Sequence, residues 1–282
     1  MRIGHLENGC QLPYNSHGMN GIDSAKRKLK RARQHLNAVD ACAIRYMETV
    51  TTRIVDGTDG KRTIHFSKEP PIRVAILAGE IVYQLRSALD HLAFELVKGN
   101  LSGTVLPKDW QRNCQFPLCL EVPTKGNPPQ ALPVPLSFNF FKDTLPGITP
   151  EAFAEIEGLQ PYNGGDGPTQ LGWLAKLSNI DKHRHLHLVL AQTHQIETIQ
   201  SGTTGSQMIH RLQDGAEIKP MLHGSGELEN AAYVRRRILS PFVTFGEESL
   251  PTDLAGDAVG AIFESCIEII SRKVIPKFEA LI

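Results

Sequence analysis

The sequence predicts an α+β protein in which three or four long helices form an antiparallel bundle, with a β-hairpin and a small antiparallel sheet inserted. Two observations predict this class. Apolar residues recur with helical spacing in four long segments, and β-prone runs alternate with Gly-rich or Asp-Gly turns. A chain of 282 residues with 41 % hydrophobic content is long enough to bury a large core. We expect a single domain over residues 1–282.

The first predicted helix covers about residues 21–50. Its apolar residues follow one another in steps of three and four, which places them on one helical face. The opposite face carries the run "KRKLKRAR". Such a run is typical of a solvated helix face, and the alternative is a surface that contacts phosphate or an acidic partner.

A hairpin and a second helix follow. The segment "ETVTTRIVDGTDGKRTIHFS" contains two β-prone runs on either side of an Asp-Gly turn, which predicts a β-hairpin. Pro70 and Pro71 then precede a helix over about residues 72–98, which ends near Gly99.

Residues 101–150 change in character, because nine of the 18 prolines lie between Pro107 and Pro150. A long Pro-rich insert in a domain is typical of a lid, a partner-binding arm or a poorly ordered loop. Only fragments such as "CQFPLCLEV" and "SFNFF" have apolar residues to bury. A short helix is expected near "TPEAFAEIEGL".

The rest of the chain predicts two more long helices and a β segment between them. The third long helix should cover about 168–187, and the last should cover about 252–282 with an interruption near Pro276. Residues 188–246 contain four β-prone runs, "LVLAQTHQIETIQ", "SQMIHRL", "AEIKPML" and "AYVRRRILSPFVTF", which predict a small antiparallel sheet.

Composition narrows the classes of function. Thirty basic and thirty acidic residues give a formal net charge of zero, so no global field attracts the protein to nucleic acid or to a membrane. We expect a cytoplasmic protein, since the chain lacks a signal-peptide pattern and an apolar run of spanning length. Five scattered cysteines argue against a disulfide framework. No phosphate loop or metal-ligand motif is present, so no cofactor or bound metal is predicted.

The segment "YQLRSALDHLAFEL" in the second helix carries the strongest candidate site. Arg86, Asp90 and His91 lie within six positions in an otherwise buried pattern. An imidazole can exchange a proton near neutral pH, and a guanidinium can hold a phosphate through two hydrogen bonds. His91 would then act as general acid or base, Arg86 would stabilise a phosphoryl group, and Asp90 would orient one of them. The structural alternative is an ion pair between Arg86 and Asp90, with His91 at the edge of the core.

A second polar cluster, "NIDKHRHLH", ends the third helix. Asp181 continues an apolar stripe, so its carboxylate should point inward and needs a cation, for which Arg86 is the candidate. Lys182, His183 and Arg184 would extend a phosphate site or form a solvated helix end. A metal shared by His91, Glu95 and this cluster is a third alternative.

In "RSALDH", a polar residue directly follows Arg86, and His91 lies five positions after Arg86. This arrangement on a helix resembles the signature of the HEPN superfamily. The resemblance implies a helical bundle that commonly forms a homodimer, and metal-independent cleavage of RNA in toxin, defence or RNA-processing systems. It also implies that a nucleotidyltransferase antitoxin is a possible partner.

Four segments together resemble a group of uncharacterised bacterial proteins that carry them in this order: "LRSALDHLAFEL", "CQFPL", "GLQPYN" and "LGWLAKLSNIDKHRHL". That resemblance implies no activity. Two hypotheses therefore lead: an RNA-cleaving nuclease that uses His91 and Arg86, and a noncatalytic interaction module in which Arg86, Asp90 and Asp181 form a structural network. A metal hydrolase is the third.

Overall fold

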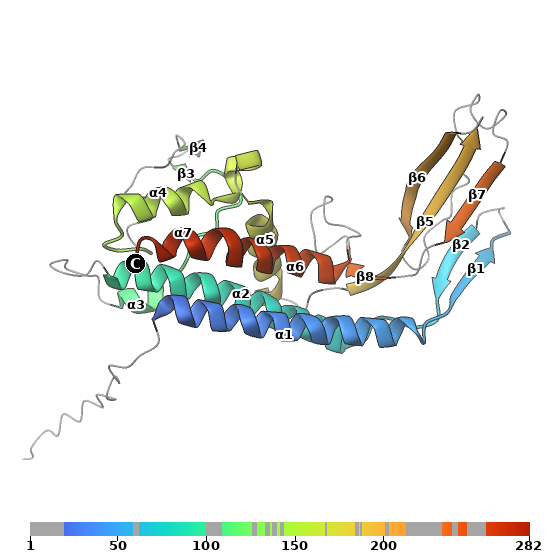
Figure 1. Cartoon of the computed structure of the whole chain (residues 1–282), viewed down its shortest axis with the longest axis horizontal. Coiled ribbons are helices and arrows are strands. Elements are labelled where there is room, and N and C mark those ends of the chain that lie inside the picture. The colour runs from blue at the N-terminus through green and yellow to red at the C-terminus, as the bar shows by residue number, and fades with distance from the viewer. Residues whose placement is uncertain are drawn as a thin grey trace, which may run out of the picture.

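The structure is a computed structural model, and it describes residues 20–58, 62–99, 109–125, 129–132, 136, 140–141, 144–166, 168–183, 186, 188–200, 203–212, 233–238, 242–246 and 258–282. Long helices dominate it, and small antiparallel sheets accompany them (Figure 1). The predicted α+β class is therefore confirmed.

Helices α1 (Gly21–Met47) and α2 (Ile72–Gly99) lie side by side along most of their length (Figure 1). Asn20 caps α1 by accepting a 2.7 Å hydrogen bond from the Asp23 N–H. The apolar stripe of each helix is buried in one continuous core, as the sequence pattern predicts. Both helices begin and end within a few residues of their predicted bounds.

The predicted hairpin between these helices is present. Strands β1 (Thr52–Asp56) and β2 (Arg62–Phe66) pair antiparallel, with Ile54 opposite Ile64. A second sheet follows the third long helix, with strands β5 (Leu188–Gln200), β6 (Thr203–Leu212), β7 (Tyr233–Ile238) and β8 (Phe242–Phe245). Strand β5 pairs with β6, β7 and β8. The predicted strand "AEIKPML" lies outside the described residues.

The third long helix, α5 (Thr169–His183), ends four residues before its predicted end. The C-terminal helix is seen as α6 (Val259–Ile269), a π-helical turn (Ile270–Val274) and α7 (Ile275–Glu279), and its predicted start near residue 252 lies outside the described residues. Pro276 explains the interruption. It has no N–H to donate within the helix, and the Ile275 N–H bonds the Ile270 carbonyl five residues back.

The Pro-rich insert contains short elements that the sequence pattern did not predict: helix α3 (Trp110–Asn113) and the paired strands β3 (Thr124–Lys125) and β4 (Gln130–Ala131). The short helix predicted after it is α4 (Pro150–Gly158), which Thr149 caps through a 3.2 Å bond from the Ala152 N–H. Phe116 of "CQFPL" is fully buried among the core residues. This part of the insert is therefore integral to the core.

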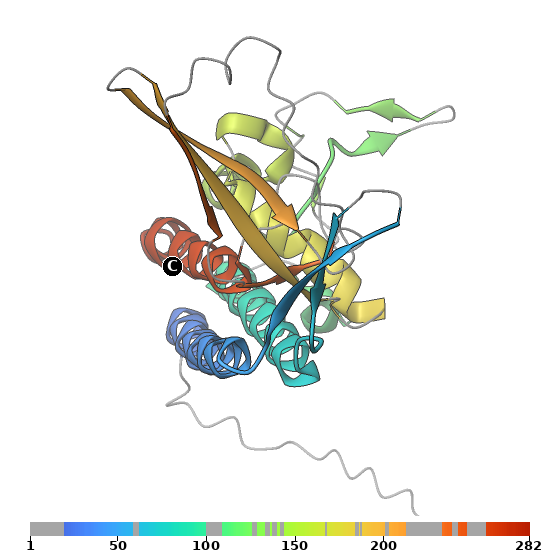
Figure 2. The ribbon, with the colours of Figure 1, turned by 90° about the vertical axis from the view of Figure 1, so that its right-hand side faces the viewer.

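The elements divide along the length of the molecule. Helices α1, α2, α4, α6 and α7 run beside one another in Figure 1, whereas the β1–β2 hairpin and the β5–β6–β7 strands extend beyond the C-terminal end of α1. Figure 2, seen from that end, shows the strands in front of the helices. The candidate site on α2 thus lies within the helical part.

Candidate functional site

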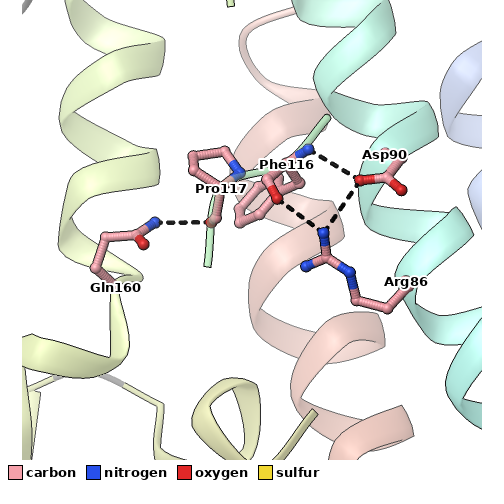
Figure 3. A network of polar contacts seen from close by, with 5 residues as sticks. All are labelled: Arg86, Asp90, Phe116, Pro117 and Gln160. Atoms are coloured by element: carbon pink, nitrogen blue, oxygen red, sulfur yellow. Dashed lines mark hydrogen bonds and ion pairs between the residues drawn. The ribbon is translucent and has the colours of Figure 1, made fainter. Parts of the chain in front are cut away.

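Arg86 and Asp90 lie one turn apart on α2, and both bind the backbone of the same residue, Phe116. The Arg86 Nη2 donates to the Phe116 carbonyl at 3.1 Å, and the Phe116 N–H donates to Asp90 Oδ1 at 2.9 Å. Arg86 Nη2 and Asp90 Oδ1 are 3.5 Å apart, so the three groups close a ring (Figure 3). The ring satisfies both backbone polar groups of a buried residue, which would otherwise be costly to bury.

Burial determines the electrostatics of this ring, since the Arg86 side chain is only 16 % exposed and that of Asp90 is 36 % exposed. Burial lowers the pKa of Arg86, and Asp90 partly offsets this. Burial raises the pKa of Asp90, although Arg86, the Phe116 N–H, His91 and Lys182 each act to lower it. Both charges are therefore held at a desolvation cost, which the contacts with Phe116 help to offset.

Gln160 holds the other side of the same segment. Its side chain is fully buried, and its Oε1 accepts from the Cys119 N–H at 2.9 Å. Its Nε2 donates to the Pro117 carbonyl at 3.1 Å (Figure 3). The same Nε2 donates to the Ile156 carbonyl at 2.9 Å. The Gln160 amide thus pairs with the backbone of residues 117–119 as a neighbouring strand would. We call the ring and the Gln160 contacts together the Phe116 clamp.

The start of α1 packs against α2 at His91 and Glu95. The Gly21 N–H donates to Glu95 Oε2 at 3.0 Å, and a Cβ added at Gly21 would lie 2.5 Å from the His91 carbonyl oxygen. The His91 side chain is half-buried. Its pKa is lowered by burial and by the positive charge of Lys28, while Asp90 acts in the opposite direction. The lowered pKa favours the neutral form of the imidazole and makes it a weaker base than an exposed histidine.

The second polar cluster lies only partly within the described residues. Arg86 makes its ion pair with Asp90, and Asp181 lies against another position of α2, where a Cβ at Gly79 would come 2.7 Å from Asp181 Oδ1. Lys182 is exposed and close enough to Asp90 to lower its pKa. The two clusters thus approach one another through Lys182, and the ion pair described for Arg86 is the one with Asp90. The side chain of His183 and the whole of Arg184 lie outside the described residues.

Neither a metal site nor a membrane-spanning helix occurs among the described residues. They contain no group of three or more His, Cys, Asp or Glu side chains placed to hold a metal ion. No helix among them has the combined length and apolarity that a membrane span requires. Glu95, the predicted partner of His91 in a metal site, accepts from the Gly21 N–H and lies 3.5 Å from the Lys98 ammonium group.

Sequence reasoning missed the partners that define this site, Phe116 and Gln160. Arg86 binds a backbone carbonyl and Asp90 a backbone N–H, and side-chain chemistry gives no signal for either. The clamp joins three segments, "LRSALDH", "CQFPL" and "GLQPYN", that lie far apart in the sequence.

The site can hold a buried polypeptide segment in place, because every described hydrogen bond of Arg86, Asp90 and Gln160 goes to backbone atoms of the protein. Comparison of the chain with protein-family models, with curated proteins and with solved structures gives no match.

Proposed function

We propose that the protein is a noncatalytic module, built on a helical bundle, that binds single-stranded RNA through the outer face of α1. The binding surface is the basic strip, which we define as Arg27, Lys28, Lys30 and Arg31. The single observation that carries the proposal is that this strip makes no ion pair among the described residues and lies beside the exposed Tyr83.

The charges of α1 divide into two groups. Lys26 forms an ion pair with Glu279 of α7, and Arg33 forms one with Glu264 of α6, so these two cations serve the contact between helices. Arg27, Lys30 and Arg31 are exposed and have no such partner in the described part of the chain. Four cations within five positions attract a polyanion locally, even though the net charge of the protein is zero.

Tyr83 favours nucleic acid over other polyanions. Its side chain is 60 % exposed, and the Lys28 ammonium nitrogen lies 5.3 Å from the centre of its ring. Exposed aromatic rings beside basic groups bind single strands, because any base can stack on the ring while the cations contact the phosphates. The alternative without a ligand is a solvated helix face on which Lys28 and Tyr83 form a cation–π pair.

Catalysis by Arg86 is less well supported than binding. To reach a phosphate, the guanidinium would have to leave the Phe116 carbonyl and Asp90, which would leave polar groups without partners in a largely buried site. RNA cleavage through His91 and Arg86 therefore stays a prediction. A homodimer and a nucleotidyltransferase partner likewise stay predictions.

Fluorescence anisotropy with a labelled single-stranded RNA tests the proposal. The double variant Arg27→Glu, Lys30→Glu should weaken binding and reduce the slope of log K against log salt by about 1.4, since each phosphate contact on a single strand contributes about 0.7. Arg112→Glu, an exposed arginine on α3, is the matched control. Equal affinity in the double variant and in the control would exclude the basic strip.

The same RNA should be examined for cleavage. We expect intact RNA with the wild-type protein and with His91→Ala. If the wild type cleaves RNA, and His91→Ala abolishes cleavage while its melting temperature stays unchanged, the noncatalytic proposal is wrong and the nuclease hypothesis replaces it.

A further inference from the structure

A groove of about 490 Å³ lies between the C-terminal half of α1, the strand β8 and the first turn of α6. On α1 its lining runs from Leu36 to Met47, which corresponds to a length of about 16 Å at the rise of an α-helix. A groove of this volume is within the range of small-molecule sites. A lining of this length suits a chain-like ligand.

The two ends of the groove differ in chemistry. Near the start of α6 it is lined by the carboxylates of Asp40 and Glu264. Toward the end of α1 the lining is apolar and includes Ala43, Met47 and, from β8, Val243. Ile44 is 56 % exposed at this apolar end. The groove thus combines a mostly apolar lining with two carboxylates.

Asp40 carries the negative charge at the polar end without a cation of its own. Glu264 pairs with Arg33, whereas Asp40 makes no ion pair or hydrogen bond among the described residues. A Cβ added at Gly260 of α6 would lie only 2.7 Å from Asp40 Oδ1. The lack of a side chain at Gly260 therefore leaves room for the Asp40 carboxylate. Asp40 is exposed, and its partial burial beside α6 raises the pKa of its carboxyl group.

We propose that this groove is a binding site for a small amphipathic organic cation, an alkyl chain that carries one ammonium group. The ammonium would pair with Asp40 and the chain would lie along Ala43, Met47 and Val243. The site is distinct from the basic strip, because the strip occupies the outer face of the N-terminal half of α1.

Isothermal titration of the full chain with octylammonium tests the site, with octanoate and octan-1-ol as probes that share the same tail. Wild-type protein should bind octylammonium saturably and each of the other two probes at least fivefold more weakly, since only the ammonium complements the carboxylate. Asp40→Asn should weaken octylammonium binding by at least fivefold. Octylammonium and octan-1-ol should then bind alike.

A pair of tryptophan substitutions locates the tail. Ala43→Trp should fill the apolar end and abolish binding, whereas Ala41→Trp, at an exposed position of the same helix, should leave it unchanged. No saturable octylammonium binding at 10 mM, on the order of the weakest useful affinities, overturns the proposal. Equal binding by wild type and Asp40→Asn does the same. A lower melting temperature in Asp40→Asn, with no probe binding by either protein, would assign Asp40 to the stability of α6 alone.

Discussion

The contacts of Arg86 favour a structural role for "RSALDH" over a catalytic one. A guanidinium that serves a phosphate needs free donors toward solvent, whereas Arg86 is 16 % exposed and bonds the Phe116 carbonyl. The direct Arg86–Asp90 separation of 3.5 Å is long for a charge-assisted bond. The two side chains are therefore linked mainly through the backbone of Phe116.

Arg86→Ala should destabilise the protein by about 1.5–3 kcal/mol, because a hydrogen bond from a charged donor to the Phe116 carbonyl is lost. Asp90→Asn should cost less, since the amide oxygen still accepts from the Phe116 N–H. Chemical denaturation of both variants and of the double variant measures the coupling. Arg73→Ala, at an exposed position of α2, is the control. If Arg86→Ala is no more destabilising than this control, the clamp does not stabilise the fold.

His91 should give the stability of the protein a pH dependence of defined sign. Burial, and then Lys28, lower its pKa in the folded state, so between that pKa and about 6.5 the unfolded chain binds more protons. Stability should therefore rise with pH through this window. The penalty is fully present below the folded pKa and absent above the unfolded one.

Titration of the His91 ring by NMR tests this directly. The midpoint should lie below the usual histidine value, and Lys28→Met should raise it by removing a positive charge. Asp90→Asn should lower it further, since Asp90 acts in the opposite direction. A midpoint above the usual value in the wild type would show that Asp90 dominates the environment of His91.

Between secondary-structure elements, the closest described approach of α1 to α2 at a glycine is at Gly21. A Cβ at Gly21 would lie 2.5 Å from the His91 carbonyl oxygen and 2.6 Å from Glu95 Cβ. Gly21→Ala should thus destabilise the protein by about 1–3 kcal/mol, because the start of α1 must move away from α2 and weaken the bond from the Gly21 N–H to Glu95. Thermal or chemical unfolding measures the loss. Gly99→Ala is the matched control, since nothing lies within 4 Å of an added Cβ, and it should be neutral or stabilising. Equal effects in the two variants would mean that the helices are not tightly packed at Gly21.

The sequence predicts these elements well and their contacts poorly. Apolar spacing locates α1 and α2 to within a few residues, because the stripe that makes a helix amphipathic is the stripe that is buried. It could not show that the segment of Phe116 and Pro117 docks between Arg86 and Gln160, because the bonded residues lie 30 and 43 positions apart in the sequence and the segment bonds only through its backbone. The Pro-rich composition of the insert predicted a lid or a binding arm. The insert nevertheless contains a segment with a fully buried phenylalanine, Phe116.

The whole molecule has one main core, and among the described residues no fully buried side chain of the β1–β2 hairpin belongs to it. Residues from α1, α2, α4, α5, α6 and α7 form a single cluster, which also includes Leu188, Val243 and Phe245 from the ends of β5 and β8. Ile64 of β2 is fully buried but lies outside that cluster, and it is the one fully buried residue among the described side chains of the β1–β2 hairpin. Strands with few links to the main core are expected to open separately from it.

Native-state hydrogen exchange should therefore show two levels of protection. Ladder amides of β1 and β2 should exchange through an opening that costs at least about 1.4 kcal/mol less, or tenfold in protection, than the opening that exposes α2 amides such as Leu85 and Leu89. Ile64→Ala should lower the protection of the hairpin further while that of α2 stays unchanged, because the side chain removed does not belong to the main cluster. If the hairpin and α2 instead exchange with one common free energy, and Ile64→Ala lowers both equally, then the hairpin and the helices unfold as one cooperative unit. In that case Phe66, which packs against the main cluster, couples the hairpin to the core more strongly than its partial burial indicates.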